Sequence, residues 1–245
     1  MSGFLTRREI LSRFINGLIV FSSYAFFPLR KVEAGRPGND IRKGGPMDLQ
    51  QPRKQGDISL ENAINNRRTI RSFASKKLTG EQFSQLLWAA QGITDGKGFK
   101  RSAPSGGALY PMNIYAVVGE NLIEGMKAGI YHYEPHGHTI SLIITGDLRK
   151  EVARAALSQM WMAKPPLTLV ITAEYGRITS KYGQRGVRYA MIEAGHIGQN
   201  IFLQAEALGL RAGIVGAFHD RDVIRVMKIP SIHEPLLIMP VGYKR

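Results

Sequence analysis

The sequence of 245 residues contains no cysteine. This absence excludes disulfide bonds, zinc–thiolate sites, iron–sulfur clusters and thiol nucleophiles. It is also compatible with an oxidising compartment, although it does not require one. A hydrophobic content of 44% is sufficient for one well-buried domain, whereas two domains within this length would each have a small core.

Acidic residues are scarce relative to basic ones, with 19 Asp and Glu against 33 Lys and Arg and a net charge of +14. Such an excess can indicate binding to nucleic acid or to an anionic surface. Here the cations are spread along the chain, and no predicted helix carries a basic stripe interleaved with exposed aromatic residues. We therefore expect no nucleic-acid partner.

The few histidines do not show the spacing of a metal site. His196 lies one helical turn beyond Glu193, and no second histidine or carboxylate has ligand spacing with it. His132, His136 and His138 surround a predicted hairpin, where strand alternation could gather them around a metal. We expect local hydrogen bonds for these side chains and no bound metal.

No apolar run reaches the roughly 20 residues that span a bilayer. The stretch 14–29 is apolar but interrupted by polar residues, and it follows Arg7 and Arg8 and precedes the small-residue site 32–34. This order is typical of a bacterial Tat-type signal, which we place at residues 1–34. We expect export to the periplasm or beyond, without stable membrane insertion. The alternative is a cytoplasmic amphipathic helix with an incidental Arg-Arg pair, and hence a cytoplasmic protein.

Residues 35–57 are rich in glycine, proline and charge, which predicts a flexible linker. The remaining residues, 58–245, form one domain in which hairpin and crossover connections alternate, as in α+β folds. Helices are expected at 59–66, 79–93, 147–162, 187–208 and 221–227, and strands at 114–118, 129–133, 139–144, 167–173, 212–215 and 236–241. The stretches 91–101 and 176–180 are expected to be variable loops.

Two upstream segments have the residues of an anion site and of a close backbone approach. The first contains Arg67, Arg68, Thr69 and Arg71, whose guanidinium and hydroxyl groups suit phosphate oxygens. The second is Pro104-Ser105-Gly106-Gly107, where the glycines let the main chain approach a planar ligand. The alternatives that remain open are a solvated charged turn for the first segment and an ordinary turn for the second.

Two downstream segments complete the pattern. A Lys181-Tyr182 pair stands in a glycine-rich run directly before the longest helix and can serve proton transfer. Near the end of the chain come a strand with Gly213, Val215, Gly216 and Ala217, and two terminal cations, Lys244 and Arg245. The open alternatives are a solvent-facing lysine beside a packed tyrosine and a buried strand that ends in a turn.

In this order the segments resemble the nitroreductase-like flavoenzymes, most of all their SagB/ThcOx-type dehydrogenase branch. The resemblance covers residues 58–245. It implies an α+β fold whose central sheet is mixed, mostly antiparallel and flanked by helices. It also implies a homodimer with FMN at the subunit interface, so that each site draws on both chains. The helix 187–208, with its small residues Ala190, Ala194, Gly195 and Gly198, is the candidate interface.

The resemblance further implies a role for each segment. The arginine segment and the C-terminal cations would hold the FMN phosphate, and residues 104–107 would contact the flavin ring and ribityl chain. Residues 213–217 would direct backbone donors to the pyrimidine edge, and the Lys181-Tyr182 pair would assist proton removal, as in azoline-oxidising relatives. Many nitroreductases have asparagine where this chain has Ala108, so a side-chain contact made there is absent.

Three functions remain open on the sequence. The first is an FMN-dependent dehydrogenase of the SagB/ThcOx type that moves two electrons between a small organic substrate and an acceptor such as a quinone, oxygen or a redox partner. The second is an NAD(P)H-dependent nitro- or quinone reductase. The third is a flavin-binding protein without turnover.

Overall fold

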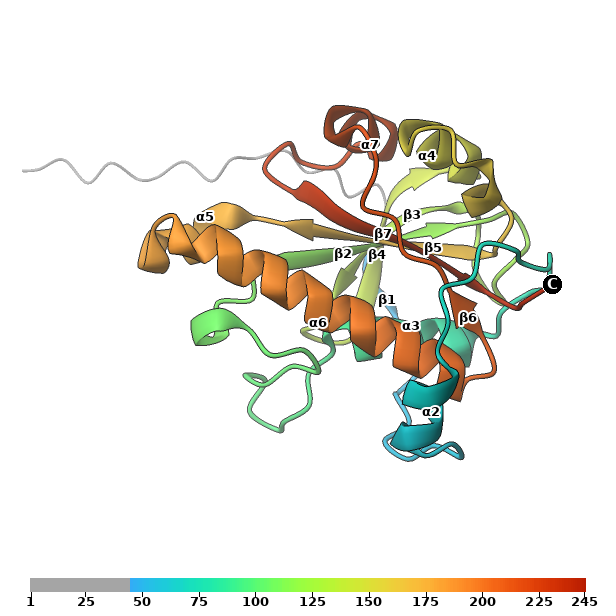
Figure 1. Cartoon of the computed structure of the whole chain (residues 1–245), viewed down its shortest axis with the longest axis horizontal. Coiled ribbons are helices and arrows are strands. Elements are labelled where there is room, and N and C mark those ends of the chain that lie inside the picture. The colour runs from blue at the N-terminus through green and yellow to red at the C-terminus, as the bar shows by residue number, and fades with distance from the viewer. Residues whose placement is uncertain (1–44) are drawn as a thin grey trace, which may run out of the picture. The chain divides into compact units, whose positions relative to one another are not determined.

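The computed structural model describes residues 45–245 (Figure 1), so the predicted signal 1–34 and the first part of the predicted linker lie outside the described residues. Its centre is a seven-stranded sheet in the order β1-β4-β3-β2-β5-β7-β6, in which every neighbouring pair is antiparallel. The α+β expectation is confirmed. The strands are β1 (Met47–Asp48), β2 (Met112–Val118), β3 (Gly129–Glu134), β4 (Thr139–Thr145), β5 (Leu167–Ala173), β6 (Arg211–Ala212) and β7 (Glu234–Gly242).

The central strands are covered on both faces, which explains their largely apolar sequences. Every residue of β2 and β5 is buried. Successive side chains of a strand point to opposite faces, so Ile114 and Ala116 enter one core cluster, whereas Tyr115 and Val117 enter the other.

Within residues 45–245, six α-helices and two short 3-10 helices surround this sheet. Helices α3 and α6 cover one face, and α4 and α7 cover the other, as Figure 1 shows. They are α2 (Leu60–Asn66), α3 (Gly80–Gln91), α4 (Arg149–Ala155), α5 (Tyr175–Tyr182), α6 (Arg185–Ala207) and α7 (Asp220–Met227), with η2 at Gly106–Ala108 and η3 at Met160–Ala163. Helix α3 begins with a capping box between Thr79 and Gln82, with both reciprocal hydrogen bonds present.

Two sequence predictions of secondary structure were wrong. The single helix expected at 147–162 is divided into α4 and η3, because Leu157 and Ser158 adopt positive φ angles that end the helix. The loop expected at 176–180 is helix α5, which leads directly into α6. Lys181 and Tyr182 therefore stand at the C-terminal end of a helix.

The described part of the predicted linker is attached to the domain. Strand β1 pairs with β4, and the carbonyl of Gln50 accepts hydrogen bonds from Ser84 and His138. The main chain of Arg53 is bound on both its N–H and its C=O by the side chain of Gln85. The composition argument failed here because main-chain hydrogen bonds, which do not require apolar side chains, hold the segment.

Within residues 45–245, none of the helices has the length and apolarity that crossing a membrane requires. The same residues contain no group of three or more His, Asp or Glu side chains arranged to hold a metal. Of the hairpin histidines, His138 bonds to Tyr133 and Ser84, and His132 bonds to Asn113.

Candidate functional site

The glycine segment (residues 104–107) and the Lys-Tyr pair meet at the N-terminal end of α6. Gly107 has a φ of +63°, and a Cβ atom added there would lie 2.5 Å from the Tyr182 hydroxyl oxygen and 3.3 Å from Lys181 Nζ. Only glycine fits this backbone conformation and this space without strain. The structure therefore brings together two segments separated by more than seventy residues of sequence.

Helix α6 holds the segment 102–107 along one face. Asn200 donates to the carbonyl of Ser102 at 3.1 Å, and His196 Nδ1 lies 3.4 Å from the carbonyl oxygen of Pro104. Nearer the helix start, Tyr189 packs on Gly106, where a Cβ would come within 3.3 Å of the tyrosine Cβ. The segment thus runs antiparallel to the helix, because its later residues contact earlier residues of α6.

Glu193 occupies the middle of this face and is a buried carboxylate with 1% of its surface exposed. Its Oε1 accepts a hydrogen bond of 3.2 Å from Gln91 Nε2, whereas its Oε2 has no hydrogen-bond partner among the described residues. Burial raises the pKa of this carboxyl to about 7, and the Ser105 hydroxyl, the Arg101 guanidinium and the Gln91 amide oppose that rise. Glu193 therefore takes up or releases its proton near neutral pH.

The two predicted catalytic side chains differ in exposure. Tyr182 is half-buried and makes an edge-to-face contact with Tyr189, with ring centroids 5.2 Å apart. Lys181 is exposed, and its Nζ lies 5.4 Å from the centroid of the Tyr182 ring. No described carboxylate lies within ion-pair distance of Lys181. The ammonium thus lies beside the glycine segment without a carboxylate partner among the described residues.

The other predicted cofactor residues meet at the opposite end of α6. The arginine segment is joined to β6 by a bridge between Thr69 and Ala212, and Phe73 is bridged to Lys244. The N–H of Arg245 donates to the carbonyl of Ser72 at 3.4 Å. The resulting cation cluster consists of Arg67, Arg71, Lys244 and Arg245, and none of the four has a carboxylate partner within the described part of the chain.

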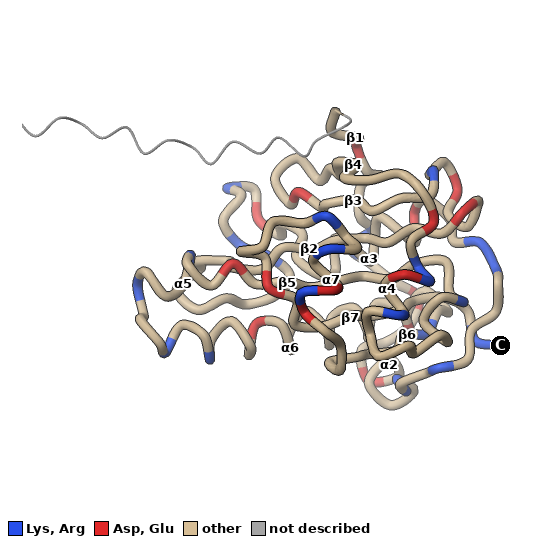
Figure 2. Tube along the Cα trace, turned by 90° about the horizontal axis from the view of Figure 1, so that it is seen from above, with Lys and Arg blue, Asp and Glu red and all other residues tan. Residues whose placement is uncertain are grey.

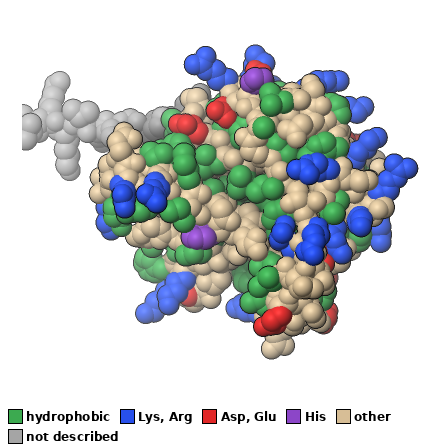
Figure 3. All heavy atoms as spheres, viewed as in Figure 1, with side chains coloured by type: hydrophobic (Ala, Val, Ile, Leu, Met, Phe, Trp, Pro, Cys, Tyr) green, Lys and Arg blue, Asp and Glu red, His purple; other side chains and the backbone are tan. Residues whose placement is uncertain are grey.

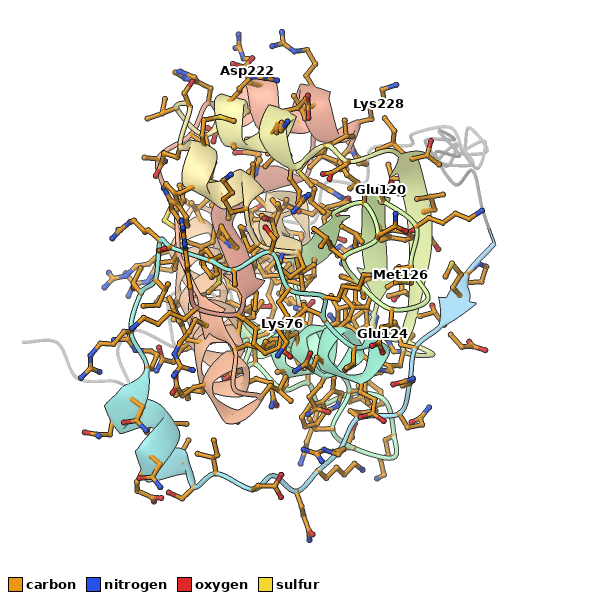
Figure 4. All side chains as sticks on the ribbon, turned by 90° about the vertical axis from the view of Figure 1, so that its right-hand side faces the viewer. Lys76, Glu120, Glu124, Met126, Asp222 and Lys228 are labelled. Carbon is orange, nitrogen blue, oxygen red and sulfur yellow. The ribbon has the colours of Figure 1, made fainter. Side chains whose placement is uncertain are left out.

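Aromatic rings support the cations at this end. Arg67 lies over the Phe202 ring at 5.2 Å and Arg71 over the Trp161 ring at 6.0 Å. Lys76, labelled in Figure 4, lies over the Tyr243 ring at 4.0 Å. Cation–π contacts orient such side chains without neutralising their charge.

Three of the predicted cofactor residues have other partners in the structure. Arg68 donates to the carbonyls of Asn65 and Arg67, both at 2.8 Å, and so caps the end of α2. The N–H groups of Gly213 and Val215 donate to the carbonyls of two β7 residues, each at 2.9 Å. These two backbone donors are therefore engaged in the sheet and are not available to a flavin. Gly216 and Ala217 are exposed.

The two groups of site residues lie far apart in one chain. Tyr189 contacts the glycine segment and Phe202 contacts Arg67, and thirteen residues of α6 separate them, or about 20 Å along the axis. Figure 2 shows Lys and Arg at both ends, around the C-terminus and around the α5–α6 corner. A single chain thus presents two half-sites, which we call the loop half-site (Lys181, Tyr182 and residues 104–107) and the phosphate half-site (the cation cluster).

The solvent face between the half-sites is partly apolar. Figure 3 shows hydrophobic side chains exposed on the face that is viewed in Figure 1. On α6, Met191 and Ile192 are 55% and 48% exposed, and on α2, Leu60 and Ile64 are 59% and 53% exposed. Between α2, α3 and α6 lies a groove of about 450 Å³. Of the small residues expected at an interface, Ala190, Ala194 and Gly198 pack inside their own chain, and Gly195 alone faces solvent, because the first three lie on the sheet-facing side of the helix.

Comparison with known proteins identifies the family. The model of the Nitroreductase family matches residues 64–243. The chain belongs to the nitroreductase family. The protein MJ1384 of Methanocaldococcus jannaschii, which carries a nitroreductase name, is 43% identical over 201 residues, covering 82% of this chain and 98% of that protein.

Two further likenesses bear on the branch and the fold. The microcin B17-processing protein McbC of Escherichia coli is 28% identical over 170 residues, or 68% of this chain and 62% of McbC. A crystal structure of a nitroreductase-type protein from Ralstonia eutropha has a TM-score of 0.71 at 26% identity and covers 85% of this chain and 92% of that one. Family and relatives together show that the protein is an oxidoreductase of the nitroreductase family.

Sequence reasoning missed Glu193 as a site residue, together with its partner Gln91, and it missed Asn200, which binds the Ser102 carbonyl. The signal was present in the spacing, since Tyr189, Glu193, His196 and Asn200 recur every three or four residues on one face of a helix. That spacing alone also fits a solvated polar face. Only the position of segment 102–107 shows that this face is covered.

The raised pKa of Glu193 predicts a measurable loss of stability with rising pH. Between about pH 4.5 and 7 the folded state keeps a proton that the unfolded chain has released, so the free energy of unfolding falls, by on the order of 2–3 kcal/mol in total. Glu193→Gln removes this dependence. Urea unfolding at pH 5 and pH 8 should show the variant gaining stability over the parent by that amount at the higher pH.

The matched control is Glu206→Gln, which changes the other buried glutamate of α6, one that has Arg211 at 3.2 Å. An equal gain in this control would show that the effect is not specific to position 193. A gain for Glu193→Gln that is the same at both pH values would contradict the assignment.

Proposed function

We propose that the protein is an FMN-dependent oxidoreductase of the SagB/ThcOx dehydrogenase type, which moves two electrons between a small organic substrate and an acceptor. The observation that carries this proposal is the meeting of the glycine segment with the Lys-Tyr pair, where Gly107 lies against Tyr182 and Lys181. A loop without a Cβ beside a proton-transfer pair suits a flat cofactor with a substrate stacked on it. The likeness to McbC, named for processing microcin B17, supports this branch.

The described residues fit FMN at both half-sites. Arg67, Arg71, Lys244 and Arg245 lack carboxylate partners among the described residues and would hold the phosphate. The space at Gly107 that a Cβ would fill allows the backbone to approach the flavin ring. The exposed main chain at Gly216 and Ala217 would face the pyrimidine edge. When bound, the flavin supplies two-electron chemistry.

The remaining steps fall to this chain's own side chains. Tyr182, held edge-on by Tyr189, places its hydroxyl where it can donate to or accept from a substrate atom above the glycine segment. Beside it, Lys181 in its neutral amine form could accept a proton from the substrate, and the ammonium that results would stabilise negative charge that develops there.

We further propose that the active form is a homodimer in which each site combines the loop half-site of one chain with the phosphate half-site of the other. The separation of about 20 Å along α6 supports this arrangement, because one chain does not bring its own half-sites together. The exposed apolar side chains of α6, Met191 and Ile192, lie between the half-sites, and those of α2 directly precede the arginine segment. Both groups are suitable for burial in such a dimer.

For the location we propose export through the Tat route, with residues 1–34 as the signal. A protein that captures its cofactor in the cytoplasm has reason to fold before export, and the Tat route carries folded proteins. The acceptor would then be a quinone, oxygen or a redox partner. Residues 1–40 fused to a reporter that works only after export should direct its export, and this should require Arg7 and Arg8. A reporter that stays inside would instead favour a cytoplasmic protein.

A second candidate is an NAD(P)H-dependent nitro- or quinone reductase, which the nitroreductase name of MJ1384 favours. The two are separated by adding NADH or NADPH anaerobically to the purified flavoprotein. When a reduced nicotinamide is added, we expect the flavin to stay oxidised and its visible absorbance to persist. When a dehydrogenase substrate is added, we expect the absorbance to bleach, and a thiazoline-containing peptide is the trial substrate. Rapid bleaching by a nicotinamide would identify the reductase.

The same assay tests the Lys-Tyr pair. Lys181→Ala and Tyr182→Phe should slow bleaching by the organic substrate about 10²- to 10⁴-fold, the usual contribution of a proton-transfer group. Flavin content should remain unchanged, because neither side chain is in the phosphate half-site. Arg188→Ala, on the exposed face of the same corner, serves as control. Unchanged rates in both variants would show that the pair has no catalytic role.

The shared site can be tested by complementation between two defective chains. Arg67→Ala/Arg71→Ala damages the phosphate half-site, and Gly107→Val damages the loop half-site. Each variant alone should bind little FMN. A heterodimer of the two, isolated with two different tags, contains one intact site and should bind about one FMN per dimer. The control is a dimer in which both chains carry the arginine changes, and it should bind little FMN. If the heterodimer binds as little FMN as this control, a site shared between chains is refuted.

A further inference from the structure

Glu193 is a buried titratable group that the proposed reaction does not use. It lies on α6 opposite the glycine segment, with Oε1 bound by Gln91. Its Oε2 makes no hydrogen bond of normal length within residues 45–245, and the Ser105 hydroxyl faces the carboxylate. A buried polar atom without a partner costs free energy, and in natural proteins such atoms are uncommon outside functional sites. The position of this buried carboxylate therefore indicates a functional role.

The groups that face this carboxylate come from three elements. Helix α3 contributes the neutral amide of Gln91, and the loop after α3 contributes the Arg101 guanidinium, which lies over the Tyr110 ring at 4.3 Å. The glycine segment contributes the Ser105 hydroxyl. On α6 itself, Tyr189 and His196 stand about one turn away on either side. Arg101 is thus the charged group among them, and Ser105 is the one that links Glu193 to the proposed cofactor surface.

The hydroxyl of Ser105 has a single hydrogen to donate. Its oxygen already accepts the N–H of Tyr110 at 2.9 Å and can accept one more hydrogen bond. An ionised Glu193 can only accept, so it draws the Ser105 hydrogen inward. A protonated Glu193 can donate to the Ser105 oxygen instead, and the serine hydrogen is then free to point away from α6.

We propose that Glu193 is a positioning residue whose protonation state decides whether Ser105 donates its hydrogen inward to α6 or outward to the flavin. This inference rests on the proposed function, because it places FMN on the glycine segment. The proton is exchanged with solvent, and no covalent step is involved. The group changes state near neutral pH, so cofactor affinity responds to pH within the physiological range.

The direction of the response follows from the geometry. At pH values where Glu193 is protonated, Ser105 donates to the flavin and the affinity for FMN is higher. At pH values where Glu193 is ionised, that hydrogen bond is lost. One hydrogen bond to a neutral acceptor corresponds to about a five- to tenfold change in affinity. Glu193→Gln always carries an amide donor toward Ser105, so it should resemble the protonated protein at every pH.

The test measures FMN binding by the apo form of the full chain from about pH 5.5 to 8.5, by flavin fluorescence. The FMN phosphate itself titrates near pH 6, so the informative quantity is the ratio of the parent dissociation constant to that of Glu193→Gln. We expect a ratio near one at the acidic end and about five to ten at the alkaline end. A ratio that does not change with pH would overturn the proposal.

Two further variants show where the effect arises. Ser105→Ala should bind FMN more weakly than the parent at low pH. Because this variant lacks the hydroxyl, the ratio of its dissociation constant to that of Glu193→Gln should not rise as Glu193 loses its proton. Glu206→Gln, at the other end of α6, should keep the parental pH response. Loss of the response in Glu206→Gln, or its persistence in Ser105→Ala, would contradict the assignment. Failure of every protein to bind FMN at any pH would refute the FMN site itself.

Discussion

The close packing of α6 on the sheet and on α5 is the contact on which the rest of the structure depends. Gly198 lies so near the sheet that a Cβ would meet Leu237 at 3.3 Å, and Gly186 lies so near α5 that a Cβ would meet Ile178 backbone atoms at 2.9 Å. These two close approaches fix the start and the middle of the helix. The contact at Gly186 sets the α5–α6 corner, and hence Lys181 and Tyr182, and the contact at Gly198 sets the level of the helix over β7.

The polar face of the same helix then determines the shape of the glycine segment. Its side chains contact Ser102, Pro104 and Gly106 in turn, so a segment with little regular structure is held at several points along its length. A buried carboxylate within such a row is costly unless it is protonated or paired. This connects the stability of the domain, the shape of the cofactor surface and pH through one residue, Glu193.

Local sequence patterns predicted most elements because those elements are determined locally. The capping box at Thr79 and the apolar run of β2 are set by neighbouring residues, and the helix predicted at 79–93 and the strand predicted at 114–118 are both present. The helix expected at 147–162 was broken by positive φ angles at Leu157 and Ser158, residues with no obvious breaking tendency. The α5 segment has no capping side chain to mark its start, and it is stabilised by packing on α6.

The sequence alone determined the chemistry that is available: no thiols, a cation-rich segment before Phe73, a glycine pair after Pro104 and a Lys-Tyr pair before a long helix. The tertiary structure decided which of these groups meet. It joined Gly107 to Tyr182, engaged Arg68 and the N–H groups of Gly213 and Val215 in other hydrogen bonds, and placed the two half-sites at opposite ends of α6. The physical reason is that contacts between distant segments depend on strand order and helix packing, which no local pattern of residues encodes.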